Sequence, residues 1–242
     1  MNSAELQSQL TLGSPESPKL PMSKDQPWLS GRHSRTQTYL YFKRGIDLFG
    51  SLSLLIVLSP FMLLICALIK LEDGGPVLFT QLRPGEKRKL FKIYKFRSLK
   101  SYSDVSPGQT SQQTRVGAFL RNWKLDETPQ LFNVYLGQMS LVGPRPCTEQ
   151  DHHRYDNSKT SIRYLAKPGM TGLWQAYRSN QIPLTHKFRF DAWYVRRASF
   201  ALDCTISLKT LAVLLEGEKK TSLKMHHRKF CNNPDGPPQS CA

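Results

Sequence analysis

Two adjacent acidic residues, Asp126 and Glu127, have the setting that phosphate chemistry needs. They lie between a basic amphipathic segment and Pro129, a residue type that suits the first turn of a helix. The N-terminus of a helix attracts phosphate, and an ionised carboxylate in a positive field can attack phosphorus. The alternative is a helix cap with an acid on the surface, which the local sequence taken alone favours.

Basic residues surround this pair in the sequence. Eleven of them lie between positions 83 and 124 against two acidic residues, so the stretch carries a net charge of +9, while the whole chain carries +16. Such a surface attracts anionic lipid headgroups, at about 1 kcal/mol per basic residue, or phosphorylated substrates. The eleven residues are Arg83, Lys87, Arg88, Lys89, Lys92, Lys95, Arg97, Lys100, Arg115, Arg121 and Lys124.

Two further arginines stand in loops that suit phosphate contact. Arg145 lies between two prolines, and Arg178 follows the glycine-punctuated loop 168–175. A planar guanidinium binds phosphate with two parallel hydrogen bonds, although each residue could equally be a surface arginine in a turn. The histidine pairs at 152–153 and 226–227 lack the spacing of metal ligands. We expect Asp191 and Asp203 to form structural pairs with arginines.

Composition narrows the class of protein. The chain has 242 residues, of which 39% are hydrophobic, and this length and composition predict one ordered domain rather than a disordered chain. Its five cysteines are widely spaced and include no C-x-x-C pair. That spacing argues against a disulfide framework or a zinc ribbon and is typical of a reducing compartment. The charge leaves nucleic acid, anionic membranes and phosphorylated substrates as partners.

One apolar segment is long enough to enter a membrane. Residues 48–69 contain no charged side chain, and a helix of that length reaches about 33 Å. Ser59 and Pro60 interrupt it near the middle, and basic residues flank both ends in similar numbers. Because a spanning helix shows a basic excess on one side, these features favour a re-entrant helix broken at Ser59-Pro60. A straight span with a proline kink and a buried soluble hairpin are the alternatives.

The remaining elements complete an α+β protein. Runs at 76–81 and 90–96 predict a short β-hairpin, and Val116, Phe119, Leu120 and Trp123 have the spacing of an amphipathic helix. A helix is expected to start near Pro129, and another contains Leu208, Leu211 and Leu215, packed on the core or the membrane surface. The predicted divisions are a flexible arm (1–38), the re-entrant helix (39–71), a cytoplasmic or interfacial catalytic domain (72–217) and a flexible basic tail (218–242).

Taken in order, these motifs resemble the small monotopic phosphoglycosyl transferases of bacteria. The resemblance covers about residues 43–217 and depends on many short motifs in the same order. They are Lys43-Arg44 with Asp47, Ser59-Pro60, Gly75-Pro76 with Gln81, Arg83 and Gly85, residues 95–98, Leu120-Arg121, residues 125–127, Pro129-Gln130, residues 139–146, residues 168–175 and Asp191.

The resemblance implies both an activity and a site. Members transfer a sugar 1-phosphate from a UDP-sugar to polyprenyl (undecaprenyl) phosphate through a covalent aspartyl intermediate, release UMP, and initiate exopolysaccharide or other surface glycan synthesis. Asp126 matches the nucleophile, and Glu127 matches the neighbour that deprotonates the acceptor or orients Mg²⁺, with both acids as Mg²⁺ ligands. The matching phosphate-binding positions are Arg121, Arg145, Arg178, Lys95 and Arg97.

The resemblance also implies a location and partners. The protein would lie at the bacterial inner membrane, with its catalytic domain on the cytoplasmic face and anionic lipid around it. A homodimer or downstream glycosyltransferases would be further partners.

Two other classes of protein draw on the same features. A membrane-tethered nucleic-acid binder would use the basic charge, but the sequence contains no helix-turn-helix and no aromatic RNA-binding signature. A catalytically inactive scaffold would lose the acidic pair, which is intact here. The chain departs from the family pattern at five places near the predicted site, and we expect it to be active because Asp126 and Glu127 are retained. The departures are Leu99, Gln112, Trp123-Lys124, Thr128 and Gln138.

Overall fold

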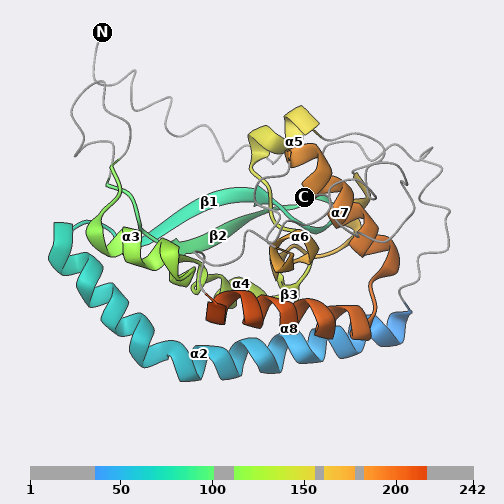
Figure 1. Ribbon diagram of the computed structural model, residues 1–242, viewed down its shortest axis with the longest axis horizontal. Coiled ribbons are helices and arrows are strands. Elements are labelled where there is room, and N and C mark those ends of the chain that lie inside the picture. The colour runs from blue at the N-terminus through green and yellow to red at the C-terminus, as the bar shows by residue number, and fades with distance from the viewer. Residues whose placement is uncertain (1–35, 101–111, 156–160, 178–182, 217–242) are drawn as a thin grey trace, which may run out of the picture.

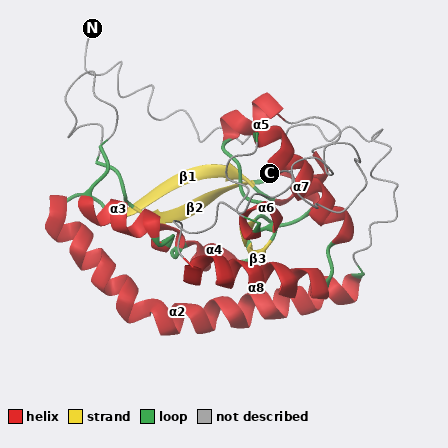
Figure 2. Ribbon diagram, viewed as in Figure 1, coloured by secondary structure: helices red, strands yellow, loops and turns green. Residues whose placement is uncertain are grey.

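The computed structural model describes residues 36–100, 112–155, 161–177 and 183–216. Arg178, the predicted tail and the predicted arm up to residue 35 lie outside these described residues. The described part contains two small sheets among helices (Figures 1 and 2). In chain order the elements are α2 (Gln37–Asp73), β1 (Leu78–Pro84), η2 (Glu86–Arg88), β2 (Leu90–Phe96), α3 (Arg115–Asn122), η4 (Leu125–Glu127), α4 (Gln130–Tyr135), β3 (Ser140–Val142), α5 (Glu149–Tyr155), η5 (Ser161–Leu165), β4 (Gly169–Thr171), α6 (Leu173–Ala176), α7 (Leu184–Arg197) and α8 (Phe200–Glu216).

The long apolar helix α2 continues through its proline. The prediction of a break at Ser59-Pro60 is therefore wrong for the backbone, and Figure 1 shows a bent but uninterrupted helix. Pro60 has no N–H to donate to the carbonyl of Ile56, four residues earlier, and the Ser59 hydroxyl donates to that oxygen instead (2.8 Å). The Ser59 hydroxyl therefore compensates for the donor that proline lacks. Because the freed carbonyl has a donor, the helix bends without opening.

The exposed side chains of α2 are mostly apolar and would suit a lipid environment. The helix is long and apolar enough to cross a membrane, and only 17% of its most apolar window is buried in the protein. Phe49, Val57 and Leu63 are each about 70% exposed. A buried soluble hairpin would cover such side chains, so this alternative does not describe the structure. The re-entrant topology stays a prediction.

The polar N-terminal third of α2 is fastened to the rest of the protein. Lys43 Nζ forms an ion pair with Asp203 on α8 (2.7 Å). Arg44 donates to two backbone carbonyls at the C-terminal end of α4 (2.8 Å each). The buried Asp47 carboxylate accepts from the hydroxyl of Ser140 (3.0 Å) and from the following backbone N–H (2.8 Å) at β3. These contacts fix the apolar helix relative to the strands and helices that carry the acidic pair.

The predicted hairpin is confirmed and forms part of the core. Strands β1 and β2 pair antiparallel, with Gln81 opposite Ile93. Phe91 and Ile93 are buried together with Val134 of α4 and Met139. Strands β3 and β4 pair in parallel as a second, shorter sheet. The hairpin therefore holds β2, and with it Lys95, against the segment that contains Asp126 and Glu127.

The predicted amphipathic helices are present, but only some of their apolar residues are buried. In α3, Leu120 is buried while Phe119 and Trp123, predicted to share its face, are more than half exposed. In α8, Ile206 is buried, whereas Leu208, Leu211 and Leu215 are more than half exposed and do not pack on the core. The expectation of packing against the core is wrong for these leucines, and their alternative placement against a membrane surface stays a prediction.

Candidate active site

The acidic pair lies in a tight turn between two helices. Asp126 and Glu127 belong to the 3-10 turn η4, which follows α3 directly and leads into α4 through Pro129, the N-cap residue of α4. Lys124 enters the turn in the left-handed conformation (φ 58°) and its side chain makes no capping hydrogen bond. Thr128 Oγ1 donates to the carbonyl of residue 125 (2.8 Å) and closes the turn. The predicted junction between a basic helix and a second helix start is confirmed.

Glu127 is held by two cations that come from different elements. Lys95 Nζ, at the end of β2, lies 2.7 Å from Oε1. Arg145, in the loop after β3, donates to Oε1 (2.5 Å) and to Oε2 (3.2 Å) in a bidentate arrangement. Burial alone would raise the pKa of Glu127, but the charges of Arg145 and Lys95 outweigh it and lower the pKa to about 2. Glu127 is therefore a fixed anion whose two oxygens are both engaged.

Asp126 differs from Glu127 in its contacts and in the direction of its pKa shift. It is half-buried, and its carboxylate forms no hydrogen bond or ion pair within the described part of the chain. Burial and the charge of Glu127 raise its pKa, and Lys95 and Arg121 partly oppose this effect. The sequence predicted that the positive field keeps this carboxyl ionised; the nearby cations do lower its pKa, but burial has the larger influence. Asp126 is thus the carboxylate of the pair that is available to a ligand.

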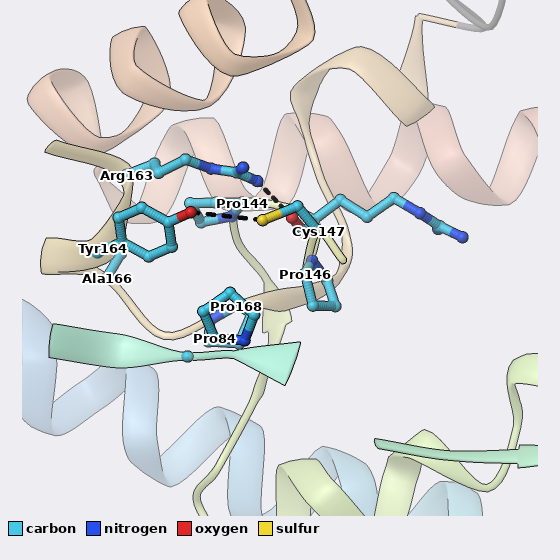
Figure 3. Close-up of a pocket in the computed structure, with 10 residues that line it drawn as sticks. Pro84, Pro144, Pro146, Cys147, Arg163, Tyr164, Ala166 and Pro168 are labelled. Atoms are coloured by element: carbon cyan, nitrogen blue, oxygen red, sulfur yellow. Dashed lines mark hydrogen bonds between the residues drawn. The ribbon is translucent and has the colours of Figure 1, made fainter. Parts of the chain in front are cut away.

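Contacts with several elements restrain both the side chain and the backbone of Arg145. Its guanidinium faces Glu127 and lies 5.8 Å from the ring centre of Trp174, over which Lys187 Nζ also lies (4.7 Å). Its backbone carbonyl accepts a hydrogen bond from Arg163 (2.5 Å). Figure 3 shows Arg163 extended above the loop that contains Pro144 and Pro146, with this hydrogen bond as a dashed line. The predicted rigid presentation of Arg145 has a structural basis.

The other predicted phosphate-binding residues lie in different surroundings. Arg121, exposed on α3, donates through Nε to Ser98 Oγ (2.8 Å), and its charge acts on Asp126. Arg97 is buried beneath the end of α2, where a Cβ on Gly75 would lie 2.0 Å from its Nη1. Arg178 lies outside the described residues. The structure therefore brings Lys95 and Arg145 into direct contact with Glu127 and places Arg97 against Gly75, just after the end of α2.

Arg163 is a residue that sequence reasoning missed. It forms a buried ion pair with Asp191 of α7 (2.7 Å), with side chains that are 3% and 1% exposed. The expected pairing of Asp191 with an arginine is thereby confirmed, whereas Asp203 pairs with Lys43 instead and accepts from Tyr39 and Tyr194. Burial raises the pKa of Asp191 to about 7, against the opposing effect of Arg163. The sequence signal that could have identified Arg163 is a single arginine among the apolar and aromatic residues of 162–166.

The acidic pair offers one position for a divalent cation. No group of three or more acidic, histidine or cysteine side chains gathers within the described residues. Mg²⁺ needs only one or two carboxylates, because it retains waters and takes phosphate oxygens from substrates. Asp126 fits that requirement, since its carboxylate has no protein partner here. Glu127 does not fit in this arrangement, because Lys95 and Arg145 occupy both of its oxygens.

Fold and site together define a class of protein. A helix long and apolar enough to enter a membrane is joined to a small domain. In that domain the Asp126 carboxylate, which has no partner among residues 36–100, 112–155, 161–177 and 183–216, lies in the field of arginines and lysines that suit phosphate binding. Residues 38–217 match the family model described as bacterial sugar transferase. The chain belongs to this family.

Several curated relatives are similar to this chain. It is 37% identical over 195 residues to the undecaprenyl-phosphate galactose phosphotransferase of Salmonella typhimurium, covering 72% of this chain but only 40% of that protein. It is 36% identical over 190 residues to exopolysaccharide production protein ExoY of Rhizobium meliloti, covering 70% of this chain and 83% of the relative. It is 41% identical over 190 residues to exopolysaccharide production protein PSS of Rhizobium leguminosarum, covering 71% and 94%. The chain thus spans less than half of the Salmonella protein and most of the two exopolysaccharide proteins.

Proposed function

We propose that this protein transfers a sugar 1-phosphate from a UDP-sugar to polyprenyl phosphate and so begins the synthesis of an exopolysaccharide or another surface glycan. The observation that carries the proposal is the contrast within the acidic pair. Among the described residues the Asp126 carboxylate has no hydrogen-bond or ion-pair partner, while the adjacent Glu127 holds Arg145 and Lys95 in place. The names of the relatives, an undecaprenyl-phosphate sugar phosphotransferase and two exopolysaccharide production proteins, support the same substrates.

The reaction consists of two in-line displacements at one phosphorus atom. A carboxylate oxygen of Asp126 attacks the phosphorus that bears the sugar, and the bond from this phosphorus to the bridging oxygen breaks, so that UMP leaves with the bonding electrons. An oxygen of polyprenyl phosphate then attacks the same phosphorus. The bond to Asp126 breaks, and the carboxylate is regenerated. Arg145, Arg121 and Lys95 supply positive charge around the phosphate oxygens in both steps.

In this proposal Glu127 organises charge rather than accepting a proton. A carboxyl whose pKa is about 2 is a poor base at neutral pH, and both oxygens are already hydrogen-bonded. A phosphate monoester is largely ionised at pH 7, so the lipid acceptor can attack without losing a proton to the protein. We assign Glu127 the task of holding Arg145 and Lys95 beside Asp126.

Mg²⁺ and the membrane complete the proposal. Asp126 would hold the ion together with substrate phosphates, and the ion would neutralise their charge. The domain would lie at the cytoplasmic face of the inner membrane, with α2 re-entrant, because the lipid acceptor is confined to that interface. Labelling a single cysteine placed at residue 2 with an impermeant reagent tests this topology. Labelling in intact cells would contradict it, and labelling only after lysis is expected.

The activity is tested by following the sugar phosphate itself. Protein purified in detergent is incubated with a panel of UDP-sugars labelled in the sugar, with Mg²⁺ and without acceptor. We expect label to stay on the protein with equimolar UMP release, and to move to lipid when undecaprenyl phosphate is added. Chelation by EDTA should stop the reaction, and added Mg²⁺ should restore it. Release of UDP instead of UMP would overturn the proposed reaction.

Substitution of the nucleophile provides the matched comparison. Asp126→Asn should remove both the labelled protein and the lipid product. Asp151→Asn, on α5, is the control for the same chemical change elsewhere and should retain both. Turnover at the parental rate in Asp126→Asn would remove the nucleophile assignment.

A further inference from the structure

The Arg163–Asp191 pair is anchored to the backbone of Arg145. Arg163 extends from η5 and Asp191 from the middle of α7, and Arg163 Nη2 contacts both Asp191 Oδ2 (2.7 Å) and the Arg145 carbonyl (2.5 Å). One buried ion pair therefore contacts the backbone carbonyl of Arg145 through Arg163.

The surrounding loop leaves this backbone little freedom. Pro144 and Pro146 flank Arg145, and each proline ring fixes its own φ and restricts the residue before it. The carbonyl of Pro144 accepts from the backbone N–H of Gly169 at β4 (2.8 Å). A Cβ on Gly169 would lie 2.1 Å from the backbone nitrogen of Gly143, so this strand lies directly against the loop. Because its backbone is fixed, the Arg145 side chain extends to Glu127 from a fixed Cα position.

We propose that Arg163 and Asp191 are positioning residues, which hold the backbone of Arg145 so that its guanidinium meets Glu127 and the transferring phosphate. This proposal rests on the proposed function above and adds two residues that would contact neither substrate. Their effect would pass through Arg145 alone.

Stability alone does not account for this pair. A buried ion pair is often no more stabilising than apolar residues of similar volume, because both charges lose their hydration. Helix α7 already contributes Phe190, Tyr194 and Val195 to the largest hydrophobic cluster. An apolar pair could join η5 to α7, but it could not donate to the Arg145 carbonyl.

The first experiment separates positioning from stability. The double variant Arg163→Met/Asp191→Leu removes both charges and leaves no lone buried charge. We expect a folded protein whose thermal midpoint stays within a few degrees of the parent, and a kcat about 100-fold lower, as expected for a misplaced catalytic contact. A folded double variant with the parental kcat would overturn the proposal. Ile206→Ala, which opens a cavity in the same hydrophobic cluster, is the control for lost stability and should lower the melting temperature but not kcat.

The second experiment asks whether the pair acts through Arg145. Asp191→Asn is compared in the parent and in an Arg145→Ala background, using kcat/KM for transfer to undecaprenyl phosphate. We expect a loss of about 100-fold in the parent and less than threefold in the background, because residues that act as one unit have non-additive effects. Losses that multiply in the background would overturn the proposal.

Failure of the positioning role is distinguishable from failure of the proposed function. If the parent protein transfers no sugar phosphate with any UDP-sugar, the proposed function fails. If the parent is active and the folded double variant is equally active, only the positioning role fails.

Discussion

Two carboxylates near Arg145, those of Glu127 and Asp191, are each paired with an arginine, and their pKa values shift in opposite directions. Glu127 is 15% exposed and has two cations, Arg145 and Lys95, which lower its pKa to about 2. Asp191 is 1% exposed and has one cation in contact, Arg163, and its pKa is raised to about 7. Desolvation is the largest influence in both cases. Glu127 has a second cation and is slightly more exposed, so its pKa falls below the ordinary value, whereas the pKa of Asp191 rises above it.

This difference corresponds to two structural tasks. The Glu127 centre keeps three charged groups together at a partly open surface, where a phosphate can join them. The Asp191 centre excludes water and contacts backbone groups, so it sets geometry and does not present charge to a ligand. Breaking the first should alter the chemistry at Asp126 directly, and breaking the second should act only through Arg145.

Removing the carboxylate charge at the Glu127 centre should have the largest effect. In Glu127→Gln, Arg145 and Lys95 lose their common anion and repel each other beside Asp126. We expect kcat to fall by about 100- to 1,000-fold, the size of effect seen when one preorganised electrostatic group is lost. Sugar-phosphate transfer to lipid measures it, and Glu149→Gln, an exposed acid on α5, is the control. Parental kcat in Glu127→Gln would show that Arg145 and Lys95 need no anchor.

The two carboxyls should also give stability opposite dependences on pH. The pKa of Glu127 falls from 4.5 to about 2 on folding, so its stabilisation is complete above pH 4.5 and disappears as the pH falls toward 2. The pKa of Asp191 rises from 3.8 to about 7, so its ionisation destabilises the fold as the pH rises from about 4 to 7. Each effect is on the order of 3–4 kcal/mol.

Denaturant unfolding from pH 3 to pH 8 measures both effects. Relative to the parent, Glu127→Gln should lose the gain in stability between pH 3 and pH 4.5, and Asp191→Asn should lose the decline between pH 4 and pH 7. Parallel pH profiles for both variants would contradict the opposite pKa directions.

Removing one cation should make the Glu127 centre resemble the Asp191 centre. In Lys95→Met, Glu127 keeps only Arg145, so its pKa should rise toward the ordinary value and part of its stabilisation of the fold should be lost. Transfer should slow by about tenfold, and stability should be lost at a higher pH than in the parent. Lys92→Met on the same strand, where the lysine is exposed, provides the control. An unchanged acid-unfolding profile would mean that Arg145 alone sets the pKa of Glu127.

Local pattern predicted the elements around the site. Two β-rich runs separated by a short turn predicted the hairpin, and i, i+3, i+4 spacing predicted α3, because both depend on neighbours in the chain. Pro129 similarly indicated the start of α4. Even the compensating hydrogen bond of Ser59 followed from a contact within one helical turn.

Contacts between distant segments were not predictable in the same way. Arg163 and Asp191 are 28 residues apart, and no periodicity specifies their meeting. Asp203 pairs with Lys43 because α8 returns to the start of α2, 160 residues earlier in the chain. The exposure of Phe119 was unpredictable for the same reason. Helical spacing identifies an apolar stripe but not which of its residues will contact the core.

The smallest expected effect concerns the aromatic surface beside Arg145. The Trp174 ring has two cations over it, Arg145 at 5.8 Å and Lys187 at 4.7 Å, so Trp174→Leu removes both cation–π contacts and leaves both ion-pair centres intact. Each such contact contributes about 0.5–1 kcal/mol, so we expect a few-fold rise in KM for the UDP-sugar and little change in kcat. Trp174→Phe, which keeps an aromatic face, should recover most of the loss. A large fall in kcat in Trp174→Leu would instead mean that Arg145 depends on this ring as much as on Glu127, and the guanidinium and backbone sides of Arg145 could then no longer be assigned separate tasks.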